Sequence, residues 1–140
     1  MDEALNTAIQ YHSNGQLNEA SEAYQKLLTI SPDNPDALHF FGVLNHQMGK
    51  STEGIDLIKR ALSLRPNYPE AHSNLGNVFR ETGNLENAVS SYREALSVAP
   101  DYAEAHYNLG QTQRALGNFE KALPSLREAV KLAPDFPEGH

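Results

Sequence analysis

The sequence contains no cysteine, and this absence removes several classes of protein. Without thiols there is no disulfide framework, no cysteine-based zinc knuckle and no thiol catalysis. Basic residues are also scarce, because 11 Lys and Arg stand against 18 Asp and Glu, a formal net charge of −7. Nonspecific nucleic-acid binding needs a basic stripe that contacts phosphates, so we expect no nucleic-acid partner.

Long apolar runs are missing as well. The longest run is far shorter than the roughly 20 residues that a membrane-spanning helix needs, so we expect no membrane partner. The stretch from Met1 to Leu5 has neither the basic nor the apolar region of a secretion signal. We therefore expect a cytoplasmic protein, which the lack of cysteine fits.

The sequence does contain a repeat of 34 residues. Proline recurs at Pro32, Pro66, Pro100 and Pro134. In the same register, glycine fills position 15 of each repeat, and small residues mostly fill positions 8, 20 and 27. A period between 20 and 50 residues indicates a stacked-repeat protein. We predict one array over 1–136, with repeats 1–34, 35–68, 69–102 and 103–136, and the start of a truncated fifth repeat at 137–140.

Each repeat predicts two amphipathic helices, because apolar residues recur at three-to-four spacing on both sides of the glycine. The first helices are predicted at 2–14, 36–48, 70–82 and 104–116, and the second helices at 18–30, 52–64, 86–98 and 120–132. Glycine at position 15 suits a left-handed turn. Asn84 and Asn118 after it suit N-caps. The proline at position 32 ends the second helix, and Pro124 is expected to bend the last one.

This pattern resembles the tetratricopeptide repeat, most closely in the two inner repeats, with residues such as Gly76, Ala88, Tyr92, Ala95 and Pro100. The resemblance implies an all-α fold, a right-handed superhelical α-solenoid of four repeats and eight helices. It also implies a non-catalytic protein-protein interaction scaffold whose concave groove binds a partner peptide or helix.

A narrower resemblance keeps an alternative open. The segments 71–77 and 105–110 are similar to repeats of O-linked N-acetylglucosamine transferases and of bacterial proteins that join such arrays to transferase domains. The chain would then be the substrate-recruiting N-terminal arm of a larger glycosyltransferase or other transferase.

In the resembled family the first helices line the groove, through positions 2, 5, 6, 9, 12 and 13. Position 2 is acidic and position 12 is basic or imidazole, which gives the groove two charged edges or simply complements the helix dipoles. The amides would bond a peptide backbone, or are only solvated, and the aromatic residues would be apolar anchors. The candidate groove residues are Phe40, Asn74, Asn77, Arg80, Tyr107, Asn108, Gln111 and Arg114.

The six histidines do not suggest a metal site. His72, His106 and His140 share position 4, but adjacent repeats stand about 10 Å apart, whereas zinc ligands each lie about 2 Å from one ion. No catalytic grouping or phosphate loop is visible, so we expect no metal, no cofactor and no enzymatic activity. The last second helix has no polar cap, and its apolar edge is a candidate surface for self-association.

Overall fold

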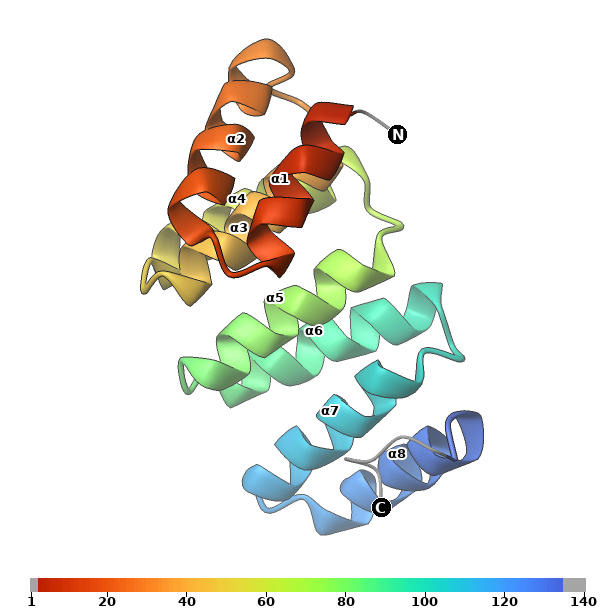
Figure 1. Ribbon diagram of the computed structural model, residues 1–140. Helices are drawn as coiled ribbons and strands as arrows, with labels where there is room; N and C mark the ends of the chain where they lie inside the picture. Colours follow the sequence, from red (N-terminus) through yellow and green to blue (C-terminus); the bar gives the residue numbers. More distant parts are fainter. Residues whose placement is uncertain (1–2, 135–140) are drawn as a thin grey trace. The chain divides into compact units, whose positions relative to one another are not determined.

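The computed structural model describes residues 3–134, and every regular element in that range is an α-helix (Figure 1). The helices are α1 (Glu3–Ser13), α2 (Leu17–Ile30), α3 (Pro35–Gln47), α4 (Ser51–Leu64), α5 (Pro69–Glu81), α6 (Leu85–Val98), α7 (Ala103–Ala115) and α8 (Phe119–Leu132). Each boundary lies within one residue of its predicted place, which confirms the helix-turn-helix repeat and the all-α fold.

The chain divides into two compact units, Met1–Pro66 with α1 to α4 and Asn67–His140 with α5 to α8. The division falls in the connection between α4 and α5, so each unit contains two of the predicted repeats. Within each unit the two helices of a repeat pack against each other, as in an α-solenoid. A single array over 1–136 and a right-handed superhelix stay predictions. The predicted start of a fifth repeat at 137–140 lies outside the described residues.

The turn inside each repeat is built around its glycine. After α5, Gly83 takes φ +87°, a left-handed conformation in which a Cβ would be strained. The Asn84 N–H donates to the Phe79 carbonyl at 2.7 Å, and the Gly83 N–H donates to the Arg80 carbonyl at 3.1 Å. These two bonds form a Schellman motif, which satisfies carbonyls at the helix end. The same pair of bonds recurs in the other three repeats.

The N-caps predicted at Asn84 and Asn118 are only partly correct. Both residues stand at the N-cap position, but neither side chain makes a capping hydrogen bond. Their ψ values of 68° and 66° lie outside the extended region that aims a side-chain oxygen at the first turn. The Asn84 amide instead donates to the Thr82 hydroxyl at 3.1 Å. A side-chain cap does form at Asn34, which accepts from the Ala37 N–H at 3.2 Å.

The prolines end the second helices as predicted. Each of α2, α4, α6 and α8 ends two residues before the proline at position 32 of its repeat. Pro124 is different, because α8 runs through it without a break. Its side chain is exposed, and its missing N–H leaves the Glu120 carbonyl without the usual helical donor. The bend that we expected there stays a prediction.

Small residues let the two helices of a repeat approach closely. In the second unit the buried cluster contains Ala88, Tyr92 and Leu109. Tyr92 is fully buried on α6 and lies directly against Gly76 of α5. A Cβ added to Gly76 would lie 2.7 Å from the Tyr92 ring, closer than packed carbon atoms allow. Glycine at this position therefore holds the Tyr92 ring beside α5.

Gly76→Ala is expected to destabilise the protein. Overpacking against a buried ring costs about 1–3 kcal/mol, and the better helix propensity of alanine returns about 1 kcal/mol. We expect a net loss of up to about 2 kcal/mol in the free energy of unfolding, measured by guanidinium denaturation of the full chain. In a Tyr92→Ala background the same change should instead raise the free energy of unfolding by up to about 1 kcal/mol, because the cavity accepts the methyl group and the gain in helix propensity remains. An equal cost in both backgrounds would show that the ring contact is not the cause.

Candidate functional site

Seven of the eight candidate residues lie on two contacting helices of the second unit. Asn74, Asn77 and Arg80 belong to α5, whereas Tyr107, Asn108, Gln111 and Arg114 belong to α7. Asn74, Asn77 and Arg80 follow helical spacing, and so do Tyr107, Gln111 and Arg114, which places each of these sets along one face of its helix. Asn108 is adjacent to Tyr107 on α7. We call the surface that these seven residues form the α5–α7 face. The eighth candidate, Phe40, lies on α3 in the first unit.

A chain of hydrogen bonds joins α5 to α7 through their amides. The Arg80 guanidinium donates from Nη1 to Asn108 Oδ1 at 2.9 Å. Asn108 Nδ2 then donates to Asn77 Oδ1 at 3.3 Å, and Asn77 Nδ2 donates to Asn74 Oδ1 at 3.3 Å. Four of the candidate residues therefore form one connected network.

Asn108 is buried within this network, with 7% of its surface exposed. Both ends of its amide bond to α5, so the side chain is not simply solvated. Asn108 therefore links α7 to α5. Direct bonding of Asn108 to a peptide backbone, as the sequence suggested, stays a prediction.

Sequence reasoning missed Tyr92 as a member of the network. Its hydroxyl donates to Asn77 Oδ1 at 2.5 Å from α6, beneath the α5–α7 face. Burial raises the pKa of Tyr92 well above its usual value of 10, against a smaller lowering by Arg80. The sequence does contain a sign of this role. Tyr92 stands at position 24 of its repeat, a packing position where Ile58 and Leu126 have no polar group.

The remaining three candidates form a second, more accessible chain on α7. Arg114 Nη1 donates to Gln111 Oε1 at 3.0 Å, and Gln111 Nε2 donates to the Tyr107 hydroxyl at 2.9 Å. Tyr107 and Gln111 are half-buried, and Arg114 is exposed. Within residues 3–134, no carboxylate forms an ion pair with Arg114. This chain thus presents an aromatic ring, an amide and a positive charge to solvent.

Phe40 is part of the packing of the first unit. Its ring lies 4.8 Å from the His39 ring, centroid to centroid, with an interplanar angle of 35°. It also packs against the buried cluster that contains Leu5 and Tyr24. Burial lowers the pKa of His39 to about 4, so this imidazole is neutral at pH 7. A role for Phe40 as an anchor for a partner stays a prediction.

At positions 2 and 12, where we expected two charged edges, some of the side chains are engaged in contacts within the protein. Asp36 at position 2 accepts two hydrogen bonds from Arg65, at 2.8 and 3.3 Å. His12 at position 12 contacts Gln47 Oε1 at 2.6 Å and the Tyr24 hydroxyl at 3.3 Å. His46, the next residue in that column, lies 2.7 Å from Ser51 Oγ.

Position 5 also differs from the expected groove lining. Leu5, His39 and Ser73 are buried at this position, and only Tyr107 is partly accessible. In the first three repeats position 5 is therefore a packing position rather than part of an accessible surface.

Among residues 3–134, no three His, Asp or Glu side chains gather closely enough to hold a metal ion. None of the helices in that range combines the length and apolar character that crossing a bilayer requires.

Comparison with known families and structures gives consistent matches. Profiles of the TPR repeat match residues 3–49 and 76–117, and profiles described as the tetratricopeptide repeat match residues 35–68 and 103–136. The sequence matches no curated protein.

Solved structures show the same fold. The crystal structure of MamA has a TM-score of 0.85 at 24% identity, over 99% of this chain and 79% of that chain. YrrB, described as a TPR protein with an unusual peptide-binding site, gives 0.82 at 26% identity, over 94% of this chain and 68% of that chain. PilF of Pseudomonas aeruginosa gives 0.91 at 19% identity, over 97% of this chain and 62% of that chain.

Tyr92→Phe tests the link between the core and the α5–α7 face. Loss of the hydroxyl leaves Asn77 Oδ1 without this donor, and we expect the free energy of unfolding to fall by about 1 kcal/mol at pH 7. The folded protein holds the Tyr92 proton more tightly than the unfolded chain does. The wild type should therefore lose stability as the pH rises above about 10, and the variant should lose less.

The measurement is denaturant unfolding at pH 7 and pH 10.5. Tyr11→Phe is the control, because no hydrogen bond from the Tyr11 hydroxyl is found in the described part of the chain. If Tyr92→Phe behaves like Tyr11→Phe at both pH values, the network does not depend on Tyr92.

Proposed function

Because the chain belongs to the tetratricopeptide repeat family, we propose that it is a protein-binding scaffold that holds a partner segment on its α5–α7 face. The observation that carries the proposal is the hydrogen-bonded link from Arg80 through Asn108 to Asn77, which joins two first helices. A surface fixed in this way loses little conformational entropy when a partner binds.

The accessible side chains beside that link suit a peptide. Gln111 carries both donors and acceptors, so it can bond the main chain of an extended segment. Arg114 provides a planar charged group that recognises carboxylates. Tyr107 offers apolar area together with a hydroxyl, a combination common at the centres of protein interfaces. The description of YrrB as peptide-binding supports a peptide partner for this chain too.

Two expectations from the sequence accompany the proposal. The chain is expected to have no catalytic activity of its own, and incubation with candidate substrates tests this. The alternative, a substrate-recruiting arm of a larger transferase, is tested by the reading frame that follows the codon of His140.

Arg114→Glu is expected to weaken peptide binding. A displayed peptide library selected on the wild-type chain supplies a ligand, and fluorescence anisotropy of that labelled peptide measures its Kd. Reversal of a charge that contacts the ligand should raise the Kd at least tenfold and reverse its salt dependence. The matched control is Arg127→Glu, which makes the same charge change at an exposed position of α8. Equal Kd values for the two variants would remove the α5–α7 face from the proposal.

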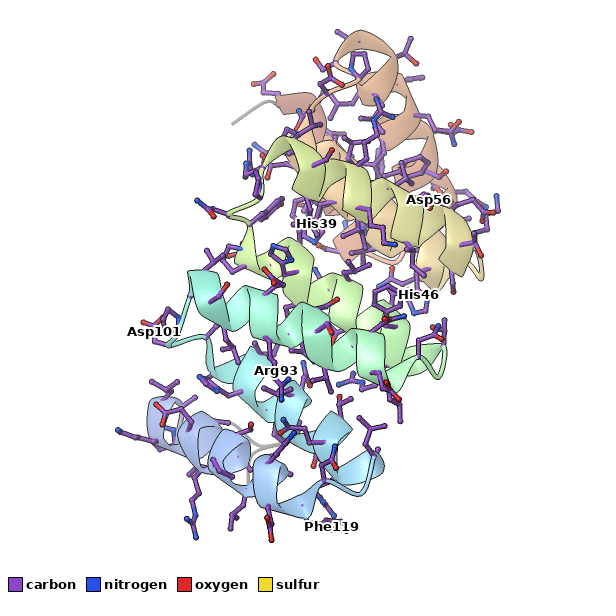
Figure 2. All side chains as sticks on the ribbon, turned by 180° about the vertical axis from the view of Figure 1, so that it is seen from behind. His39, His46, Asp56, Arg93, Asp101 and Phe119 are labelled. Atoms are coloured by element: carbon purple, nitrogen blue, oxygen red, sulfur yellow. The ribbon has the colours of Figure 1, made fainter. Side chains whose placement is uncertain are left out.

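A second candidate function, self-association, is favoured by exposed apolar side chains on α8. Phe119 is 67% exposed and Leu123 is 49% exposed. They stand four residues apart on one face of the helix, and Figure 2 shows Phe119 where α8 begins. An apolar edge of this kind is a common association surface. In the first unit an open pocket of about 370 Å³, partly apolar, lies between α1 and α2 and is lined by Tyr11, Leu27 and Ile30. We propose this pocket on a second copy as the complementary surface.

The double variant Phe119→Ser/Leu123→Lys is expected to abolish self-association. Sedimentation velocity from about 5 µM to 1 mM should show a rising mean mass for the wild type and a constant monomer for the variant. Phe119 is largely exposed and Leu123 is about half exposed, so the variant should remain folded, with only a small fall in its unfolding temperature. A wild type that is monomeric at 1 mM would contradict the proposal.

A further inference from the structure

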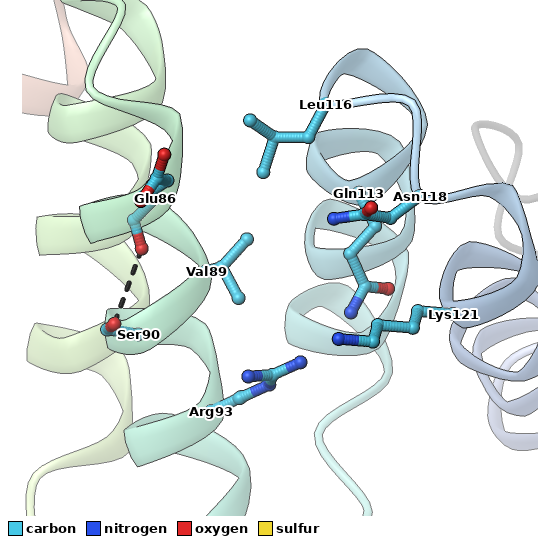
Figure 3. Close-up of a pocket in the computed structure, with 8 residues that line it drawn as sticks. All are labelled: Glu86, Val89, Ser90, Arg93, Gln113, Leu116, Asn118 and Lys121. Atoms are coloured by element: carbon cyan, nitrogen blue, oxygen red, sulfur yellow. Dashed lines mark hydrogen bonds between the residues drawn. The ribbon is translucent and has the colours of Figure 1, made fainter.

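A pocket of the second unit lies outside the α5–α7 face. Its volume is about 420 Å³, and it is open to solvent between α6 and the pair formed by α7 and α8. The residues that matter here are Glu86, Val89 and Arg93 from α6, Gln113 and Leu116 from α7 and its C-cap, and Lys121 from α8 (Figure 3). None of them belongs to the α5–α7 face.

Three nitrogen donors gather at one end of this pocket. Figure 3 shows the side chains of Arg93, Gln113 and Lys121 directed toward the same space from three helices. Gln113 is only 3% exposed, and its Oε1 accepts from the Ser125 hydroxyl at 3.1 Å. Its Nε2 is therefore the end that remains for a ligand.

The two cations are not neutralised by the protein. Among residues 3–134, neither the Arg93 side chain nor the Lys121 side chain forms an ion pair or a hydrogen bond. Glu86 also lines the pocket, but it stands two turns before Arg93 on α6, roughly 10 Å along the helix axis, at the other end (Figure 3). In a chain with a net charge of −7, the end with Arg93 and Lys121 thus has two uncompensated cations beside a buried amide donor. Such a site favours an oxyanion.

The equivalent positions of the first unit indicate which residues of this pocket the repeat fold requires. The first unit has the corresponding helices, and 68 residues earlier the places of Arg93 and Lys121 are taken by Gln25 and Glu53. There the Gln25 amide donates to Ser21 Oγ at 2.9 Å, within its own helix. The positive charges in the second unit are therefore not a packing requirement.

The spacing along α6 indicates what else the ligand carries. Val89 lies one turn before Arg93, about 6 Å along the helix axis at 1.5 Å per residue. Leu116 faces the same space from the α7 side, so an apolar patch lies next to the cationic end (Figure 3). In an extended peptide, residues i and i+2 project from the same side and are separated by about 6.7 Å. An acidic residue followed two positions later by an apolar residue matches both the spacing and the chemistry.

We propose that this pocket binds an extended acidic segment of a partner protein. The Asp or Glu carboxylate accepts from Arg93, Gln113 and Lys121, and the apolar side chain two residues away packs on Val89 and Leu116. Because the pocket is open to solvent, the partner chain can continue beyond it on both sides. We therefore favour an internal acidic residue over a chain terminus. This interaction uses a surface different from the α5–α7 face, so either can fail alone.

The test is an NMR titration of the isotope-labelled full chain with the capped peptide Ac-Gly-Ser-Glu-Ser-Leu-Gly-Ser-NH₂. We expect shifts of the Gln113 side-chain amide and of the Val89 and Leu116 methyl groups. The peptide with Gln in place of Glu should bind at least tenfold more weakly, and so should a peptide in which Glu and Leu are adjacent.

Variants of the protein complete the test. Arg93→Gln/Lys121→Gln should raise the Kd at least tenfold, whereas Arg127→Gln/Lys131→Gln, which removes the same charge from exposed positions outside the pocket, should leave it unchanged. The proposal is overturned if no pocket signal shifts at 20 mM peptide, or if the Gln peptide binds equally well. It is also overturned if a phosphoserine peptide or a free C-terminal carboxylate binds tenfold more tightly, because the ligand would then be of another class.

Discussion

The structure depends on the close approach of the two helices within each repeat. Where a first helix carries glycine at position 8, as at Gly76, the partner helix can bring a large side chain directly onto its backbone. The Schellman turn at the glycine of position 15 then returns the chain antiparallel with few residues. These two local requirements recur every 34 residues. The repeats therefore share the same helix packing, whereas their surface residues differ.

The α5–α7 face, which we propose as the binding surface, is connected to this packing through Tyr92. Its ring is held beside Gly76, and its hydroxyl donates to Asn77, the next residue of α5. From there hydrogen bonds connect Asn77 to Asn108 and Asn108 to Arg80, so a core residue is linked to polar side chains on two helices. The α5–α7 face is thus connected to the core by hydrogen bonds.

Much of the fold could be predicted from the sequence, because it is local and periodic. Glycine at position 15, proline at position 32 and the apolar spacing placed every helix end within one residue. The Asn84 cap was partly wrong, since a backbone bond in the turn sets ψ and turns the side chain away. The burial of His39 and Ser73 was also missed, because the repeat pattern places position 5 on a helix face without saying how deeply neighbours cover it.

The candidate site was predicted as a set of residues but not as an arrangement. Periodicity placed Asn77, Arg80 and Asn108 on first helices, yet it could not show that their side chains bond one another. That depends on distances between two helices that are far apart in sequence. Tyr92 and the cationic pocket at Arg93 and Lys121 were missed for the same reason, since both lie where a second helix meets its neighbours.

The most direct test of the central claim is amide hydrogen exchange of the full chain with and without a saturating selected peptide. The account predicts slower exchange in α5 and α7, centred on the turns that carry Arg80 and Gln111. Protection confined to the first unit, or no protection at saturation, would contradict it.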